Sequence, residues 1–197
     1  MNVLMTKERA LGHFIEHHVL HKWQEDIMII DEVYQKQQEQ IETHFVEVVG
    51  GLCLKAKKMQ EEGRKNTVQS LYYSMLRTRM KTHQAHYRLD LYDEQWYLDE
   101  ARCMATWDAD FIFAPLFDRM RKLEVVRTEY ARKVTAMDVE RMMQLELPRY
   151  HGIAVEFIRS MVPKVWDVIL GNGMALTTPF YIYGGEYRDQ AELLDQR

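Results

Sequence analysis

This chain of 197 residues has few residues that break helices and little of what marks a secreted or membrane protein. Only nine glycines and four prolines are present, which argues against a turn-rich β architecture and favours long helices. The two cysteines, Cys53 and Cys103, show neither CxxC spacing nor the density of a disulfide-stapled domain. No apolar run is long enough to span a bilayer, and Met1 to Arg9 lacks the pattern of a signal peptide. We therefore expect a soluble cytoplasmic protein without membrane association.

A strong excess of charge of either sign is also missing. The formal net charge is −4 and the isoelectric point is about 6.1, so the whole chain does not present a basic surface to nucleic acid. Three short basic stretches, Lys55–Lys58, Arg77–Lys81 and Arg119–Lys122, leave a local nucleic-acid face open as an alternative. Nucleic acid is thus a partner that the net charge does not support.

What is present favours helices. Hydrophobic residues make up 47% of the chain and charged residues 28%, which is ordinary globular composition, and thirteen methionines suit helical cores. From about Thr6 to Val49, apolar residues recur at helical spacing, which predicts one long amphipathic helix or two nearly collinear ones. Asn66 and Gln69 resemble a capping pair ahead of a second helix from Thr67 to near Arg88.

Further helix signals follow. Pro115 is expected in the first turn of a helix that runs to about Val134, and Thr135 with Asp138 is expected to start the next one. Together these patterns predict an all-α fold: a single-domain bundle of roughly six to eight helices over residues 1–170. Residues 171–197 are expected to form a loop-rich C-terminal segment, packed on the bundle or trailing from it, with room for a short strand or hairpin.

Histidines gather near the start of the chain, where His13, His17 and His21 are spaced four apart. On a helical wheel they lie opposite the apolar stripe that contains Val19 and Ile30. Two histidines at i and i+4 can chelate a metal ion, but a committed zinc site needs three or four protein ligands, and no HExxH occurs. We expect a solvated or partner-facing surface with weak chelation; a pH-sensitive interface and a true metal site are the alternatives.

A second polar group is more informative because it falls on a stripe expected to be buried. On the helix predicted for Thr67–Arg88, the side chains of Arg79, His83, His86 and Asp90 continue the apolar face of Leu71. Buried imidazoles and charges need partners, so these four residues would either satisfy one another or line a wet cavity. Such a cavity suits acid–base chemistry or the binding of an anion, and these residues are the candidate catalytic or ligand-binding site.

The spacing between Arg79 and His86, and between Arg77 and His83, is similar to that in the HEPN ribonuclease motif. This resemblance covers only the one stretch, and Met80 stands where that family prefers a polar residue. It implies an α bundle in which histidine and arginine act on the scissile RNA phosphate. Signatures for a phosphate loop or a nucleophile elbow are missing, and no cofactor is indicated.

Two classes of function follow from these patterns. The first is a helical protein that acts through protein–protein contacts, as an adaptor, a regulator or a subunit of a homo-oligomer. The second is a small helical enzyme or ligand-binding protein whose pocket contains Arg79, His83, His86 and Asp90, with a HEPN-like ribonuclease as its concrete form. The absence of a strong catalytic motif favours the first class.

Overall fold

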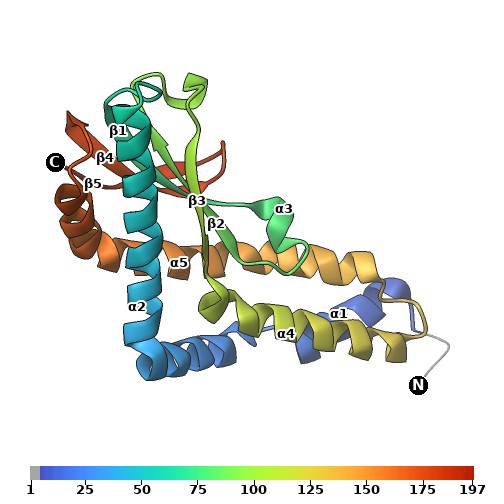
Figure 1. Ribbon diagram of the computed structural model, residues 1–197. Coiled ribbons are helices and arrows are strands. Elements are labelled where there is room, and N and C mark those ends of the chain that lie inside the picture. Colours follow the sequence, from blue (N-terminus) through green and yellow to red (C-terminus); the bar gives the residue numbers. More distant parts are fainter. Residues whose placement is uncertain (1–4) are drawn as a thin grey trace. The chain divides into compact units, whose positions relative to one another are not determined.

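The computed structural model describes residues 5–197 and contains both helices and strands (Figure 1). The helices are α1 (Lys7–His18), α2 (Trp23–Glu61), α3 (Arg77–Met80), α4 (Asp110–Val126) and α5 (Ala136–Asn172), with 3₁₀ turns η1 (Trp96–Leu98) and η2 (Arg127–Tyr130). The strands are β1 (Val68–Met75), β2 (His86–Tyr92), β3 (Cys103–Asp108), β4 (Leu176–Glu186) and β5 (Ala191–Gln196). The predicted all-α bundle is therefore wrong, and the fold is mixed α and β.

The chain forms two compact units. The helical unit combines the described part of Met1–Lys36 with Asp110–Tyr150, and the sheet unit combines Gln37–Ala109 with His151–Arg197. Two helices pass from one unit to the other along the chain: α2, which has a non-helical backbone at Gln37, and α5. This division differs from the expected one at residue 170, and the segment 171–197, expected to be rich in loops, supplies strands β4 and β5.

The sheet has the strand order β3-β2-β1-β4-β5. Strands β1, β2 and β3 form an antiparallel meander, whereas β4 returns after α5 to lie parallel to β1, and β5 pairs with β4 as an antiparallel hairpin. Tyr72 of β1 is opposite Asp90 of β2 and Tyr183 of β4. Because side chains alternate between faces along a strand, these three residues point to the same face of the sheet.

Strand β1 shows why the sequence indicated a helix here. It is the central strand, and seven of its eight residues are buried, so it lacks the alternation of a half-exposed strand. Its apolar residues Val68, Leu71, Tyr72 and Met75 also fit the i, i+3, i+4, i+7 spacing of a helix face. A turn containing α3 and His83, which has a φ of 56°, then reverses the chain into β2. The wheel drawn for residues 67–88 therefore does not apply.

The core of the sheet unit lies between one face of the sheet and the helices α2 and α5. Phe45 of α2 stacks on Tyr73 of β1 and meets Trp107 of β3 edge-on at a ring distance of 5.0 Å. Trp107 in turn stacks on Phe157 of α5. Both cysteines, Cys53 and Cys103, are buried and unpaired. These contacts place both helices on the same face of the sheet.

The helical unit is built around α4. Phe113 of α4 lies near Tyr150 of α5, and Phe14 of α1 packs edge-on against Tyr130. A buried ionic cluster, made of Arg119, Asp26, Glu146 and Tyr150, joins α4 to α2 and α5. The expected cap of α5 is confirmed: Thr135 and Asp138 exchange hydrogen bonds through their side chains and backbone N–H groups.

Several predicted helix ends differ from the structure. The long N-terminal helix is broken near His21, whose φ is 62°, and α2 then continues through Gly50 and Gly51 instead of ending there. Helix α5 likewise continues through Pro148 and Pro163. Over residues 5–197, no helix is long and apolar enough to cross a membrane.

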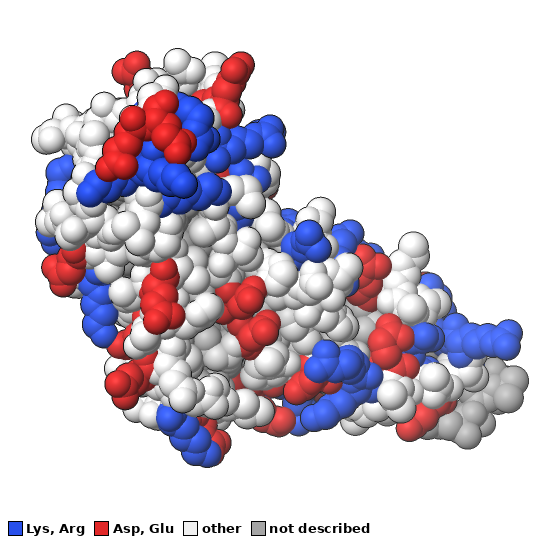
Figure 2. Space-filling view, in the orientation of Figure 1, with Lys and Arg blue, Asp and Glu red and all other residues white. Residues whose placement is uncertain are grey.

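Basic and acidic side chains are mixed on the surface. Figure 2 shows both kinds close together over the C-terminal end of α2, where the sequence contains Lys57 and Lys58 next to Glu61 and Glu62. Of the other basic stretches, Arg119 is buried in its ionic cluster and Arg77 forms an ion pair with Glu186. The stretches Arg77–Lys81 and Arg119–Lys122 are therefore partly neutralised.

Candidate ligand-binding site

The face of the sheet opposite α2 and α5 is rich in tyrosine. Tyr72, Tyr92, Tyr181 and Tyr183 point to it, and we call this surface the tyrosine face. Tyr72 is at its centre: it stacks on Tyr183 with ring centroids 4.5 Å apart and meets Tyr92 edge-on. Tyr72 also lies near Trp96 and Tyr97, in the segment between β2 and β3, with ring centroids 6.1 Å and 6.3 Å away.

A buried ion pair fixes the position of that segment, residues 93–102. Lys65 and Asp99 bind each other, and both side chains are almost completely buried. The Asp99 carboxylate also accepts hydrogen bonds from the backbone N–H groups of Asp93 and Ala101. A buried charge pair is stable only when its other lone pairs and protons are also hydrogen-bonded. These hydrogen bonds therefore fix the shape of the loop. The loop carries Trp96, Tyr97 and Arg102 to the tyrosine face.

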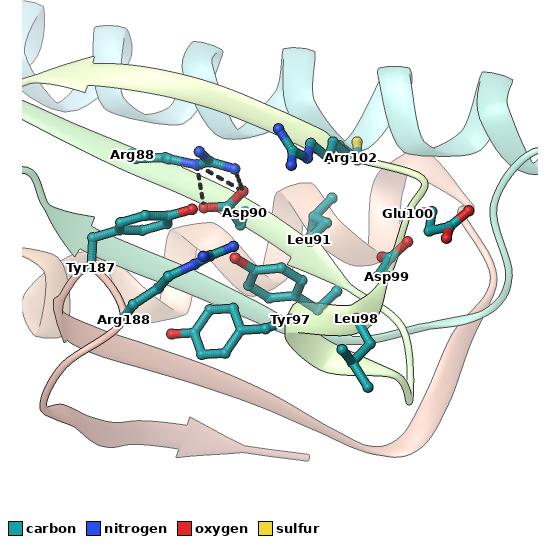
Figure 3. A pocket seen from close by; sticks show the side chains of 12 residues that line it. Arg88, Asp90, Leu91, Tyr97, Leu98, Asp99, Glu100, Arg102, Tyr187 and Arg188 are labelled. Carbon is teal, nitrogen blue, oxygen red and sulfur yellow. Dashed lines mark hydrogen bonds and ion pairs between the residues drawn. The ribbon is translucent and has the colours of Figure 1, made fainter.

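A pocket of about 330 Å³ opens where this loop meets the turn after β4 (Figure 3). This volume falls within the range of about 300–1,000 Å³ that is usual for small-molecule sites. The polar lining residues are Arg88, Asp90, Tyr92, Tyr97, Asp99, Glu100, Arg102, Tyr187 and Arg188. Arg88 donates hydrogen bonds to both oxygens of Asp90, at 2.9 Å and 2.7 Å from its Nε. This pair neutralises itself and forms a polar floor.

Two further arginines at the pocket have no carboxylate partner among residues 5–197. Arg188 lies over the rings of Tyr97 and Tyr187, with its guanidinium carbon 5.5 Å and 5.4 Å from their centroids. Arg102 makes no ion pair with any residue in the range 5–197. Glu100 is the one exposed carboxylate of the lining, and Figure 3 shows it at the opposite end of the pocket from Tyr187 and Arg188. The end that contains Tyr187 and Arg188 is therefore positive.

The phenols of Tyr92 and Tyr97 stay protonated near neutral pH. Burial raises the pKa of Tyr97 and, more strongly, that of Tyr92. Burial alone would lower the pKa of Arg88, but the hydrogen bonds and charge of Asp90 outweigh it, and the net shift is upward. The site thus combines hydroxyl donors, guanidinium donors and flat aromatic rings, a set that suits a ligand with both a ring and an anionic group.

The four residues predicted as a catalytic or ligand site do not form one cluster. Asp90 lines the pocket and binds Arg88. His86 is the first residue of β2, and its Nε2 lies 3.0 Å from Oδ1 of Asp108. Arg79 is on the short helix α3 and donates a hydrogen bond to the side-chain oxygen of Gln84. His83 is in the turn that follows α3. The structure therefore separates Asp90 from the other three, because a strand pair replaces the predicted helix.

The N-terminal histidines contact a tyrosine. His13 lies 2.9 Å and His18 3.2 Å from the Tyr130 hydroxyl, and His13 stacks on His17. His21 is in the turn before α2 and is exposed. Within residues 5–197, no group of three or more His, Cys, Asp or Glu side chains is arranged to hold a metal ion. Of these histidines, His13 and His18 form a helix-docking contact with Tyr130 inside the helical unit.

The residues at the positive end of the pocket were missed at the level of sequence. Arg88 was expected at the end of a helix, and Tyr187 and Arg188 in the loop-rich C-terminal segment. A period of two was visible in Arg88, Asp90 and Tyr92, which alternate with Leu89 and Leu91. Tyr97, Arg102 and Arg188 reach the site from loops, and such residues carry no periodic signal.

The comparisons with known proteins add no assignment. No protein-family model matches the chain. Neither a curated protein nor a solved structure shows significant similarity to it. The candidate site therefore depends on its geometry alone, and the family of the chain stays open.

Proposed function

We propose that this protein binds a nucleotide-like ligand, a planar ring that carries phosphate, in the pocket on the tyrosine face. The observation that supports this function best is that Arg102 and Arg188, which have no carboxylate partner among residues 5–197, line the same pocket as Tyr97 and Tyr187; Arg188 lies over both of these rings. Guanidinium groups recognise phosphate through paired N–H donors, and tyrosine rings stack on flat heterocycles. Each half of such a ligand therefore meets a matching partner.

The Arg88–Asp90 pair favours a defined ligand over nonspecific anion binding. Asp90 is buried and accepts three hydrogen bonds from Arg88, so its carboxylate is held in one position at the floor. Arg88 is in turn held by the Tyr187 ring, 4.8 Å from its guanidinium carbon. A preorganised polar floor loses little conformational entropy when a ligand binds.

Calorimetric titration of the protein with adenosine 5′-monophosphate tests this function. Separate titrations with adenosine and with inorganic phosphate measure the two halves of the ligand. We expect the nucleotide to bind more tightly than either half. Arg188→Ala should weaken nucleotide binding about tenfold or more, because it removes charged hydrogen bonds to phosphate. It should change adenosine binding much less.

Lys58→Ala is the matched control, since Lys58 is an exposed cation of the same unit on α2. It should leave nucleotide affinity unchanged while lowering the net charge by the same amount. If the wild-type protein binds no nucleotide, or if the two variants behave alike, the pocket is not a nucleotide site.

The protein–protein role expected from the sequence stays a prediction. The helical unit exposes several apolar side chains, Leu20, Ile27, Met28 and Ile29 among them. Sedimentation of the purified chain checks whether it self-associates, and a strict monomer over a wide concentration range would contradict a homo-oligomer.

A further inference from the structure

Trp96 is an exposed aromatic side chain next to the pocket but outside its lining. The residue is 47% exposed, and its ring stacks on that of Tyr97 with centroids 4.2 Å apart. Its backbone adopts a φ of 53°, a left-handed conformation that is uncommon for a bulky residue. Such strain persists where the surrounding structure enforces it, and it is found most often at binding and catalytic sites.

Local contacts hold the indole in this exposed position. The Trp96 backbone N–H donates to the carbonyl of Asp93, whose carboxylate accepts from the N–H of Gln95. The indole also lies beside the ring of Tyr72, with ring centroids 6.1 Å apart, and burial raises the pKa of the Tyr72 hydroxyl to about 12. The rings of Tyr97 and Tyr72 thus flank an indole that remains 47% exposed. An exposed ring that its neighbours hold in place can stack on the flat ring of a ligand.

The aromatic rings continue from Trp96 across the tyrosine face. The ring centroid of Tyr72 lies 6.1 Å from that of Trp96, and Tyr72 stacks on Tyr183. The ring centroids of Tyr183 and Tyr181 are 6.0 Å apart. Tyr181 and Tyr183 are both partly exposed. The row therefore runs from the pocket, through Trp96, to β4. A single nucleotide would occupy only the pocket end of it.

We propose that the ligand is a single-stranded nucleic acid, whose terminal nucleotide enters the pocket and whose next base stacks on Trp96. This inference depends on the nucleotide site proposed above and specifies its ligand as a polymer. Unpaired bases stack on aromatic side chains with little dependence on sequence, and arginines beside the rings bind the backbone phosphates. The overall charge of −4 is compatible with this, because the two unpaired arginines gather at the pocket.

The test measures fluorescence anisotropy of labelled oligoadenylates of two, four and eight nucleotides, with adenosine monophosphate as competitor. Affinity should rise from one nucleotide to four and then level off. Trp96→Ala should weaken binding of the tetranucleotide about 5- to 150-fold, the effect of losing one base stack, and leave nucleotide monophosphate binding within about twofold. Trp96→Phe should restore most of the loss. With Arg102 and Arg188 as the phosphate contacts, the logarithm of affinity should fall with log salt at a slope of about −1.4.

Leu54→Ala is the control for loss of an exposed apolar side chain, because Leu54 is 58% exposed on α2. It should bind the tetranucleotide like the wild type. A duplex of the same length should bind more weakly, since its bases are already stacked. If monophosphate binds but length and Trp96→Ala have no effect, or if the duplex binds equally well, the polymer inference fails and the nucleotide site stands. If neither monophosphate nor oligonucleotide binds, both proposals fail.

Discussion

Buried charges in this protein occur in groups that are paired within their own unit. Lys65 binds Asp99 in the sheet unit, and Arg119 binds Asp26 and Glu146 in the helical unit. Such groups stabilise the folded state little more than apolar side chains of similar size would. Removing one partner, however, leaves a buried charge without compensation. The stability of each unit is therefore most sensitive at these few positions.

Arg119 is the clearest case for a measurement. Its side chain is 9% exposed and donates to Asp26 at 2.8 Å and to the Tyr150 hydroxyl at 3.0 Å. Arg119→Leu should lower the free energy of unfolding by about 3–5 kcal/mol, because the Asp26 carboxylate would stay buried without its cation. Urea denaturation followed by circular dichroism measures the change.

Arg121→Ala, on the same helix, is the control for this substitution. The Arg121 and Asp118 side chains form an exposed pair, with 57% of each accessible. Exposed pairs contribute little, so stability should change by no more than about 0.5 kcal/mol. Equal effects of the two substitutions would mean that the buried cluster does not hold the unit together.

Single residues also show how far the sequence could locate the site. Asp90 was selected because a helical wheel placed it on an apolar face; the wheel does not apply to strand β2, and Asp90 lines the pocket as the partner of Arg88. Tyr97 and Arg102 gave no such signal, since their position depends on the loop that Lys65 and Asp99 hold, and Arg188 lies in the turn between β4 and β5. Contacts between residues far apart in the sequence decide those positions, and local patterns do not contain them.

Among the helices and strands, prediction succeeded where a capping motif precedes a long stretch of apolar residues at helical spacing. The start of α5 at Thr135 and Asp138 was predicted, as was a helix that contains Pro115. The bounds of that helix were wrong, since α4 begins at Asp110, which places Pro115 beyond its first turn, and ends at Val126 instead of near Val134. Strand β1 was not predicted, because a central strand and a helix face can share the same apolar spacing. The N-terminal helical pattern was expected to end near Val49, yet α2 continues through Gly50 and Gly51 to Glu61.

Two glycines give opposite expectations for the elements that contain them. Gly51 is inside α2, and no atom lies within 4 Å of the place that an alanine Cβ would occupy, so Gly51→Ala should stabilise the protein by about 0.5–1 kcal/mol. At Gly185 of β4, a Cβ would lie 2.2 Å from the carbonyl oxygen of Gln190, in the turn to β5. Gly185→Ala should therefore destabilise the β4–β5 hairpin, and thermal unfolding compares the two variants. Similar melting temperatures for both would contradict this difference.

For the whole molecule, composition limited the fold without deciding it. The scarcity of glycine and proline agrees with the long helices α2 and α5. The sheet was hidden because β3 and β4 are separated by 67 residues and because β1 pairs in parallel with a strand near the C-terminus. Pairing between distant segments depends on tertiary packing, and a local period of hydrophobic residues does not reveal it.

The response to acid is a property of the whole molecule that two groups of the sheet unit should dominate. Burial lowers the pKa of His151, whose Nδ1 lies 2.6 Å from the Tyr87 hydroxyl. A hydrogen bond from Arg77 lowers the pKa of Glu186. For both groups the unfolded chain binds protons more readily than the folded one, so stability falls as the pH falls.

The two groups act in different pH ranges. His151 should contribute a loss of stability that begins as the pH drops through about 6.5, the ordinary value of histidine, and Glu186 a loss that begins near about 4.3. Urea denaturation at pH 7.5, 6.0 and 5.0 should show a decline in the wild type that is smaller in His151→Gln, because glutamine does not titrate. Measured between pH 5.0 and 4.0, Arg77→Ala should instead weaken the pH dependence, since Glu186 would then have a pKa closer to its ordinary value. An unchanged slope between pH 7.5 and 5.0 in His151→Gln would show that a neutral, half-buried His151 is not what makes the fold sensitive to mild acid.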